Sequence, residues 1–381
     1  MVNQIKKLQL FSASKDQLEY FTQLKKHIDL PVECTHYKNV VGFSLFVRVP
    51  KDELKKQVEI LLQRKANSAS GKSKPSWFWK LFRLINQINA NLLYRKYFGW
   101  LQRLDADFVG VWNGKKFRQA ILVLAAKAQN KQIIYFETGP LPGYSVIDPV
   151  GVDYYSAIPR SADFYLARPL KSSVVNLKED FPRPRNLPVH YIFVPFQVVE
   201  DSNIYLHSPW IKDMRHLYKA LEIAAEENPA IHFVVKPHPA CPERYDDLMK
   251  SNHPQIQFVE EHASQVLVQH ADAVLTINST VGMEAIMARK KVLVLGQAIY
   301  GFAPLSQPVA NQAELEKTFK NLTNWKVEER LVEHYLDYLA TDYAIEGDAM
   351  KSPTKAHWKQ AQEKLSMMLS GKLMQAIGLG R

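Results

Sequence analysis

The chain has 381 residues, of which 46% are hydrophobic and 23% charged, and its formal net charge is +11 at pH 7. This length predicts two domains, because a single hydrophobic core usually stops growing before a chain becomes so long. The composition is ordinary for a globular protein, no apolar run is long enough for a transmembrane helix, and two distant cysteines, Cys34 and Cys241, exclude a disulfide framework.

The positive charge attracts polyanions, and three kinds fit: nucleic acid, the anionic inner leaflet of a membrane, and a phosphorylated or acidic-sugar substrate. No zinc-finger, helix-turn-helix or RNA-binding pattern is present, so nucleic acid is not an expected partner. We find no N-terminal signal peptide, and the cysteine usage indicates a reducing compartment. We therefore expect a cytoplasmic protein.

The N-terminal part predicts two strands, a helix and a loop. Lys7–Ser12 is an apolar strand, followed by a helix through Leu24 and Ile28, and the apolar run Val40–Val49 predicts another strand. Lys65–Pro75 is polar and rich in Gly, Ser and Lys, which is typical of a mobile loop.

The region Trp77–Trp100 combines basic and aromatic residues with apolar positions at helical spacing. One interpretation is a core helix with a solvated basic face. The other is docking on anionic lipid, because a basic amphipathic helix gains from both apolar burial and surface potential. The second interpretation predicts peripheral attachment at the inner membrane.

A pattern of a short apolar strand followed by Asn and small residues occurs twice, in Asp105–Gly114 and in His270–Thr280. Strands that alternate with helices predict parallel sheets, and ligands bind beyond the carboxyl ends of such strands. Asn113 and Gly114 follow the first strand in this way. The two copies predict an α/β protein with two Rossmann-like halves that face one cleft.

The later strands are expected at the following apolar runs: Val189–Pro195, Ile231–Lys236, Ile256–Val259 and Lys291–Leu295. A linker rich in proline and charge, Lys178–Pro188, is expected to separate the halves. We therefore expect an N-terminal acceptor domain of residues 1–182, a nucleotide-sugar domain of residues 183–345 and a helical tail of residues 346–381.

The motif Lys236-Pro237-His238-Pro239 directly follows a buried-looking strand. Its prolines keep the backbone extended, so Lys236, His238 and Pro239 are expected at the edge of a ligand site. A histidine there can donate to a phosphate or act as a general acid.

A second motif, Asn278-Ser279-Thr280, leads from a strand into a helix that contains Glu284. Amides and hydroxyls at a helix start can bind an anion, so Ser279 and Thr280 are candidates for phosphate, with Asn278 beside them. Glu284 could accept from a ribose hydroxyl. The alternative is simple capping of the helix by Ser or Thr.

A third motif runs from Glu137-Thr138-Gly139-Pro140 to Asp148 and Asp153-Tyr154 and is rich in turn-forming residues. Three carboxylates on loops suit sugar transfer, in which one acts as base or nucleophile and another orients or protonates. The alternative is an ordinary proline-bearing surface loop. Gly139, Asp153 and Tyr154, with Asn113 and Gly114, are candidates for the acceptor side.

Several rival chemistries lack their motifs. No GxxxxGK[ST] or GxGxxG sequence is present, which argues against a kinase and a dinucleotide oxidoreductase. The histidines do not have zinc-ligand spacing. Asp105-Ala106-Asp107 resembles a metal-binding Asp-x-Asp, but it precedes its strand, so we interpret it as structural.

Taken in chain order, from Glu137 through Lys236 to Asn278, the three motifs resemble those of the capsule polysaccharide synthesis family, whose characterised members include retaining Kdo transferases. That family has a Glu-Gly loop before a stretch like SLVLDxxGIYYD, which is similar to SVIDPVGVDYY at Ser145–Tyr155, then a KPHP element and a motif like NSTVGMEA. The resemblance spans about Phe136 to Tyr300. This chain is shorter than the tandem members, so we expect a single-module enzyme.

The resemblance implies a GT-B fold and a CMP-sugar donor, CMP-Kdo, without a metal or other cofactor. It implies that His238 contacts the CMP phosphate and that Ser279 and Thr280 bind phosphate or cytidine. Asp148 would match the nucleophile of retaining members, and Glu137 a second acidic group near a glycolipid or saccharide acceptor of capsule or lipopolysaccharide.

Three alternatives stay open. A teichoic-acid-type polyol-phosphate transferase would use a CDP-polyol and also release CMP. A sugar-nucleotide 2-epimerase is another GT-B option, but it would carry Gly-Gly and paired Glu residues in place of Ser279–Glu284. A non-catalytic capsule assembly or export component docked on the membrane is the third.

Overall fold

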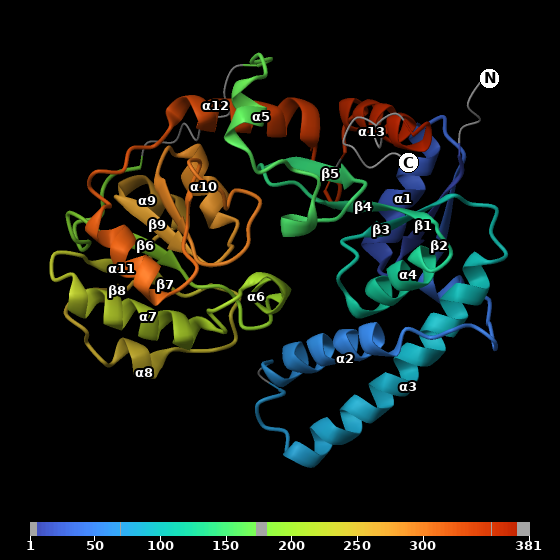
Figure 1. Ribbon diagram of the computed structural model, residues 1–381, viewed down its shortest axis with the longest axis horizontal. Helices are drawn as coiled ribbons and strands as arrows, with labels where there is room; N and C mark the ends of the chain where they lie inside the picture. The colour runs from blue at the N-terminus through green and yellow to red at the C-terminus, as the bar shows by residue number, and fades with distance from the viewer. Residues whose placement is uncertain (1–5, 69, 173–180, 352, 372–381) are drawn as a thin grey trace. The chain divides into compact units, whose positions relative to one another are not determined.

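The computed structural model describes residues 6–68, 70–172, 181–351 and 353–371, so the expected linker Lys178–Pro188 begins outside the described residues (Figure 1). The described chain forms two compact units. Unit 1 contains the described residues up to Gln63, Lys74–Ile158 and those from Ala340 onward, and unit 2 contains Arg64–Ser73 and Pro159–Leu339.

The sheet of unit 1 has six strands in the order β12-β5-β4-β3-β1-β2. The neighbouring pairs among β1 to β4 are parallel, whereas β5 runs antiparallel to β4, and β12 antiparallel to β5. The strands are β1 (Leu8–Ser12), β2 (Val32–His36), β3 (Phe108–Trp112), β4 (Gln132–Thr138), β5 (Tyr144–Asp148) and β12 (Ile345–Glu346).

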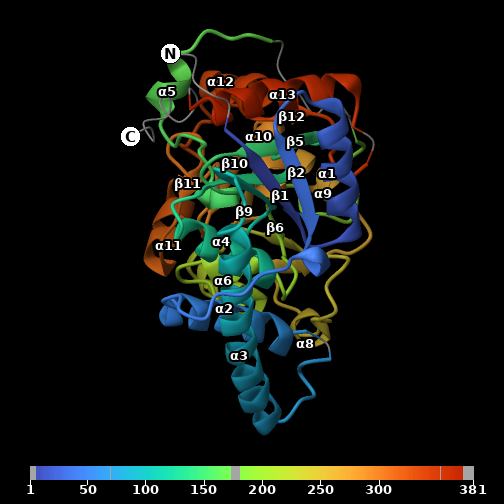
Figure 2. The same ribbon diagram turned by 90° about the vertical axis from the view of Figure 1, so that its right-hand side faces the viewer.

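Helices cover both faces of this sheet. The helices are α1 (Lys15–His27), α2 (Lys51–Ala66), α3 (Ser76–Leu101), α4 (Phe117–Lys127) and α13 (Lys355–Leu369), with short 3-10 turns at Tyr37–Asn39 and Asp153–Tyr155. Leu8 and Leu10 pack with α1 and α13, while Val109 and Val111 pack with α3 and α4. Figure 2 shows α1 beside β1 and β2. Because both faces are covered, β1 and β3 are buried along their whole length.

The sheet of unit 2 also has six strands, in the order β11-β10-β9-β6-β7-β8, and every neighbouring pair is parallel. The strands are β6 (Ile192–Pro195), β7 (Phe233–Lys236), β8 (Ile256–Phe258), β9 (Ala273–Thr276), β10 (Lys291–Val294) and β11 (Gln307–Pro308). The carboxyl ends of these strands therefore meet at one edge.

The helices of unit 2 separate these strands in sequence. They are α5 (Ala162–Leu166), α6 (Ser202–His207), α7 (Met214–Glu227), α8 (Asp246–Met249), α9 (Ser264–His270), α10 (Val281–Met287), α11 (Gln312–Lys320) and α12 (Glu329–Tyr338), after which a π-helical turn spans Leu339–Tyr343. Two Rossmann-like units confirm the predicted α/β class with two parallel-stranded sheets of the GT-B type. The cleft between them stays a prediction.

The expected strand at Val40–Val49 is wrong. These residues have no regular structure and lie against the end of α3. A Cβ on Gly42 would come within 2.3 Å of the Trp100 amide nitrogen, so the chain is held by a close backbone approach to a helix. Its apolar residues had suggested a strand, but no strand pairs with it.

The domain boundaries also differ from the expected ones. The first boundary falls between Ile158 and Pro159, not at residue 182. The described part of the expected tail of residues 346–381 is not separate, because β12 extends the sheet of unit 1 and α13 buries Trp358, Leu365 and Met368 in its core.

Candidate functional site

Asn113 and Glu137 meet at the carboxyl edge of the sheet of unit 1. Asn113 follows β3 with a positive φ of 62°, and its backbone amide donates to the carbonyl oxygen of Phe136, 2.7 Å away. This turn brings the Asn113 side chain to Glu137 near the end of β4, where its Nδ2 donates to Glu137 Oε2. The Thr138 amide donates to the other oxygen, Oε1, at 2.9 Å. Both carboxylate oxygens are thus oriented.

The Glu137 carboxyl is partly buried, and burial raises its pKa above the usual range. The hydrogen bonds from Asn113 and Thr138 oppose this effect, as does the charge of Lys115, while the negative charge of Asp153 adds to it. A carboxyl with a raised pKa next to a second carboxylate is a common arrangement for acid–base chemistry.

Lys115 and Asp153 form an ion pair beside Glu137. The Lys115 side chain is 9% exposed and that of Asp153 is 41% exposed, so the carboxylate remains accessible. Asp153 has a positive φ of 51° at the start of a 3-10 turn. The sequence analysis missed Lys115, although its position after Asn113 and Gly114 at a strand end could have indicated it.

Asp148 has a different environment. It is the last residue of β5 and is fully buried. Its carboxylate accepts hydrogen bonds from the amides of Val150, Gly151 and Ala157 at 2.7–2.9 Å, and from the Tyr343 hydroxyl at 2.9 Å. With four donors and no exposed surface, Asp148 is placed to hold the loop after β5, which differs from the expected role as nucleophile.

The two glycines expected at the acceptor side are explained by backbone geometry. Gly114 has a φ of 76°, which favours glycine. A Cβ on Gly139 would lie 2.8 Å from the carbonyl carbon of Tyr144, so only glycine fits this β4–β5 connection. Tyr154 packs its ring 6.2 Å from that of Tyr155. The structure thus assembles Asn113, Glu137 and Asp153, and gives the glycines a scaffold role.

In unit 2, Lys236, His238 and Pro239 line a pocket of about 350 Å³ after β7. The Lys236 ammonium donates to the carbonyl oxygen of Glu260 at 2.7 Å, and burial lowers its pKa. His238 is exposed, and its Nδ1 accepts from the Ala240 amide at 3.1 Å. The neutral imidazole therefore carries its proton on Nε2, which is left as a donor for a ligand.

Asn278 ties the end of β9 to the chain after β6. Gln197 Nε2 donates to Asn278 Oδ1 at 3.0 Å, and Asn278 Nδ2 donates to the carbonyl oxygen of Asn203 at 3.1 Å. These bonds give Asn278 a positioning role. The sequence analysis missed Gln197, which follows β6 at the same edge of the sheet. Because ligands bind beyond the carboxyl ends of parallel strands, its position could have indicated it.

The residues after Asn278 are held by a fully buried tyrosine. The Tyr300 hydroxyl donates to the carbonyl oxygen of Ser279, whose Oγ accepts from the Val281 amide at 3.2 Å. Thr280 is exposed and makes no side-chain capping bond. Glu284 is partly buried, and burial raises its pKa. Ser279 thus makes part of the helix cap that was the alternative to phosphate binding, whereas Thr280 remains exposed.

Lys236 is the last residue of β7, and Asn278 follows β9, on the two sides of β6. Both motifs therefore lie at the same carboxyl edge, as predicted from the strand pattern. Among the residues that the structure describes, no three His, Cys, Asp or Glu side chains are grouped so that they could hold a metal ion. Independence from metal stays a prediction.

Comparison with known proteins decides the family. Residues 177–349 match the family described as capsule polysaccharide biosynthesis protein. Protein FixF of Sinorhizobium fredii is 30% identical, and the match covers 88% of this chain and 90% of FixF. The chain belongs to the capsule polysaccharide biosynthesis family. The matched residues include the Lys236 and Asn278 motifs, and the predicted resemblance is confirmed.

Other relatives are more distant. The capsule polysaccharide export protein KpsS of Escherichia coli is 26% identical over 255 residues, 48% of this chain and 64% of that protein. Among solved structures, the beta Kdo 2,7 transferase KpsC of Thermosulfurimonas dismutans aligns with a TM-score of 0.49 and 18% identity, over 95% of this chain and 99% of that one.

Proposed function

We propose that this member of the family is a glycosyltransferase that moves a sugar, Kdo, from a CMP-sugar to a capsule or lipopolysaccharide acceptor or its lipid-linked precursor. The observation that carries the proposal is the Glu137 carboxylate, oriented by Asn113 and Thr138 and with its pKa raised by burial. Such a group is suited to take a proton from a sugar hydroxyl.

The reaction forms a bond from an acceptor hydroxyl oxygen to the anomeric carbon and breaks the bond from that carbon to a phosphate oxygen of CMP. The bonding electrons leave with CMP, and the acceptor proton passes to Glu137. His238 Nε2–H and the Lys236 ammonium would offset the negative charge that grows on the phosphate. We assign Thr280 and Ser279 to the nucleotide at the same edge of unit 2.

A retaining course needs a carboxylate nucleophile as well. Asp148 is already occupied by four hydrogen-bond donors, so we assign it to positioning of the loop after β5. Asp153 is partly exposed, and its charge acts on Glu137, so it is our candidate for the nucleophile.

The test is release of CMP from CMP-Kdo by the purified full chain, with and without a Kdo-bearing or lipid-linked acceptor. We expect acceptor-dependent release to fall at least about 100-fold in Glu137→Gln and in His238→Ala. Glu19→Gln, a matched change at an exposed glutamate of α1, should leave it unchanged.

Three outcomes would overturn the assignment. Full activity of Glu137→Gln would remove the proposed base. Release of CMP from a CDP-polyol but not from CMP-Kdo would identify a polyol-phosphate transferase. Nucleotide binding without turnover on any acceptor would indicate an assembly or export component.

A further inference from the structure

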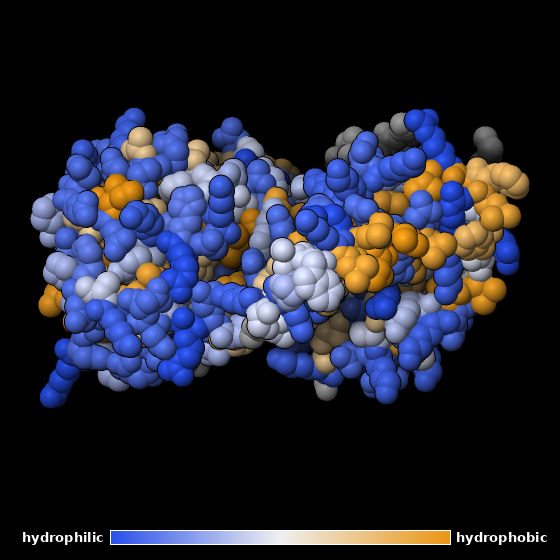
Figure 3. All heavy atoms as spheres, turned by 90° about the horizontal axis from the view of Figure 1, so that it is seen from below, coloured by the Kyte–Doolittle hydropathy of each residue, from blue (hydrophilic) through white to orange (hydrophobic). Residues whose placement is uncertain are grey.

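The outer face of α3 exposes a stripe of large apolar side chains. Its six members are between 47% and 64% exposed: Trp77, Leu81, Leu84, Ile85, Ile88 and Leu92. At 3.6 residues per turn they fall within about 100° of arc on one side of the helix. Figure 3 views the molecule from the side on which α3 lies, and apolar residues gather there in an orange patch. Such a patch marks an interaction surface.

The loop Val41–Phe46 extends this patch at the C-terminal part of α3. Val41, Phe43, Leu45 and Phe46 are exposed, and Phe46 is 99% exposed. The loop is fixed to the helix: the Ser44 amide donates to the carbonyl oxygen of Arg95 at 3.1 Å, and Arg95 Nη1 donates back to that of Ser44 at 3.3 Å. The exposed side chains are therefore held on a rigid support.

The charges along α3 have one sign. Its 26 residues include four basic side chains and no acidic one. In helical projection, Lys80 and Lys96 lie at the two borders of the apolar stripe. An anionic lipid surface attracts a helix of this kind. The basic side chains contact the negatively charged headgroups, while the apolar face between them enters the acyl boundary.

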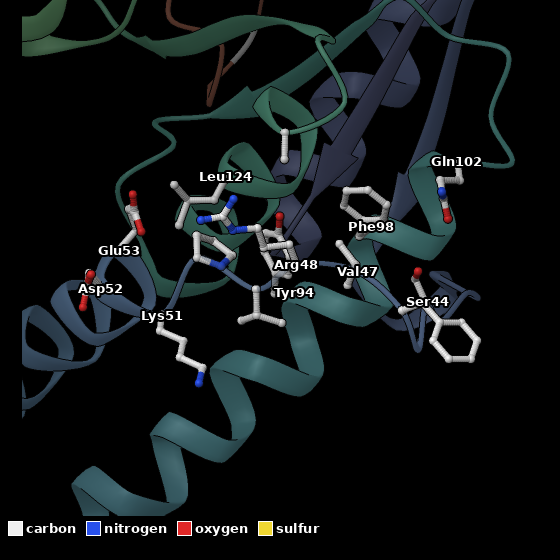
Figure 4. A pocket seen from close by; sticks show the side chains of 14 residues that line it. Ser44, Val47, Arg48, Lys51, Asp52, Glu53, Tyr94, Phe98, Gln102 and Leu124 are labelled. Carbon is white, nitrogen blue, oxygen red and sulfur yellow. The ribbon is translucent and has the colours of Figure 1, made fainter.

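Arg48 adds a cation beside the patch. It lines a pocket of about 1200 Å³ between the loop, α3 and α4, where Figure 4 shows it close to Leu124 and Tyr94. Asp52 and Glu53 line the end of this pocket at the start of α2. Arg48 thus places a cation two residues beyond the exposed Phe46, in a pocket that Phe46 also lines.

We propose that the outer face of α3 and the loop Val41–Phe46 together bind the surface of an anionic lipid bilayer. In the described part of the chain, no helix is both long enough and apolar enough to span a bilayer. Arg83 pairs with Glu59 of α2, whereas Lys80 and Lys96 give the borders of the stripe a positive charge, which the negative surface potential of an anionic bilayer attracts. This inference is independent of the proposed transferase activity.

The test is cosedimentation of the full chain with vesicles of phosphatidylcholine alone and of phosphatidylcholine with phosphatidylserine. We expect binding to the anionic vesicles that weakens at high salt. The double variant Leu84→Glu/Ile88→Glu should bind at least about tenfold more weakly, because each change removes an apolar side chain from the acyl boundary. Its thermal unfolding should match that of the wild type, since both positions are exposed.

The matched control is Val189→Glu/Ile223→Glu, which charges two exposed apolar positions of unit 2 and should bind vesicles as the wild type does. No binding of the wild type to anionic vesicles, or equal binding by the α3 variant, would overturn the proposal. So would a dimer in solution that the α3 variant dissociates, because the stripe would then be an interface between copies of this chain.

Discussion

Lys364 is a buried lysine at the centre of unit 1. Its Nζ lies 4.9 Å from the ring centroid of Tyr343, whose hydroxyl donates to Asp148, and it has no hydrogen-bond partner among the described residues. Burial lowers the pKa of Lys364 to about 8, against the opposing charges of Asp148 and Asp342. A charged group in this position weakens the fold.

The pH dependence of stability should reveal this lysine. Its pKa is lower in the fold than the ordinary value of 10.5, so the cost is fully present below about pH 8 and is relieved as the pH rises toward 10.5. Lys364→Met should therefore be more stable than the wild type at pH 7, and this advantage should shrink by about 3 kcal/mol as the pH approaches 10.5.

Urea unfolding of both proteins across this pH range measures the difference. The control is Lys359→Met, an exposed lysine of the same helix, whose effect should not change with pH. A pH-independent difference for Lys364→Met would show that the lysine is charged equally in both states.

At the scale of elements, α13 is the least expected part of unit 1. Thr354 caps its N-terminus by accepting a hydrogen bond from the His357 amide. The helix packs against α1 through Trp358, whose ring lies 5.5 Å from that of Tyr20. Tyr20 also exchanges a hydrogen bond with His357 at 3.0 Å. The helix is therefore part of the core, although more than 300 residues separate it from α1.

Leu365→Ala tests this packing. Leu365 is fully buried against the sheet of unit 1, so the change should lower the free energy of unfolding by about 3 kcal/mol. Met367→Ala, two residues further along at a 44% exposed position, should cost less than about 0.5 kcal/mol. Equal, small losses in urea unfolding would place α13 outside the core.

At the scale of the whole molecule, the candidate groups are divided between the units. Glu137, Asn113 and Asp153 belong to unit 1, and Lys236, His238 and Thr280 belong to unit 2. The proposed function assigns the nucleotide to the second set. CMP, which is the nucleotide without the sugar, should therefore bind to unit 2 and protect only that unit.

Hydrogen exchange with and without CMP tests this division. We expect CMP to slow exchange in peptides that contain Lys236–Cys241 and Asn278–Glu284, and to leave those around Asn113 and Glu137 unchanged, because binding lowers the opening of the segments that it contacts. His238→Ala should abolish the protection. Protection that centres on Glu137 would assign the nucleotide to unit 1 instead.

Much of both units could be predicted from short segments. Phe108–Trp112, Phe233–Lys236 and Ala273–Thr276 are apolar runs because strands buried on both faces have no polar side, and the polar residues after them mark the carboxyl edges. The helix at Trp77–Trp100 could be predicted from its periodicity. The strand predicted from the same kind of pattern at Val40–Val49 was wrong, because this apolar run packs on α3 instead of pairing with another strand.

The amino-acid sequence by itself determined the α/β class, the strand-end motifs and the family, since each depends on residues close together along the chain. Only the tertiary structure decided that Asp148 is enclosed by a tyrosine 195 positions away, and that Lys115 joins Asp153. It also decided that the last described helix completes the first unit. Burial and hydrogen bonding between distant segments control these roles, and no local pattern records them.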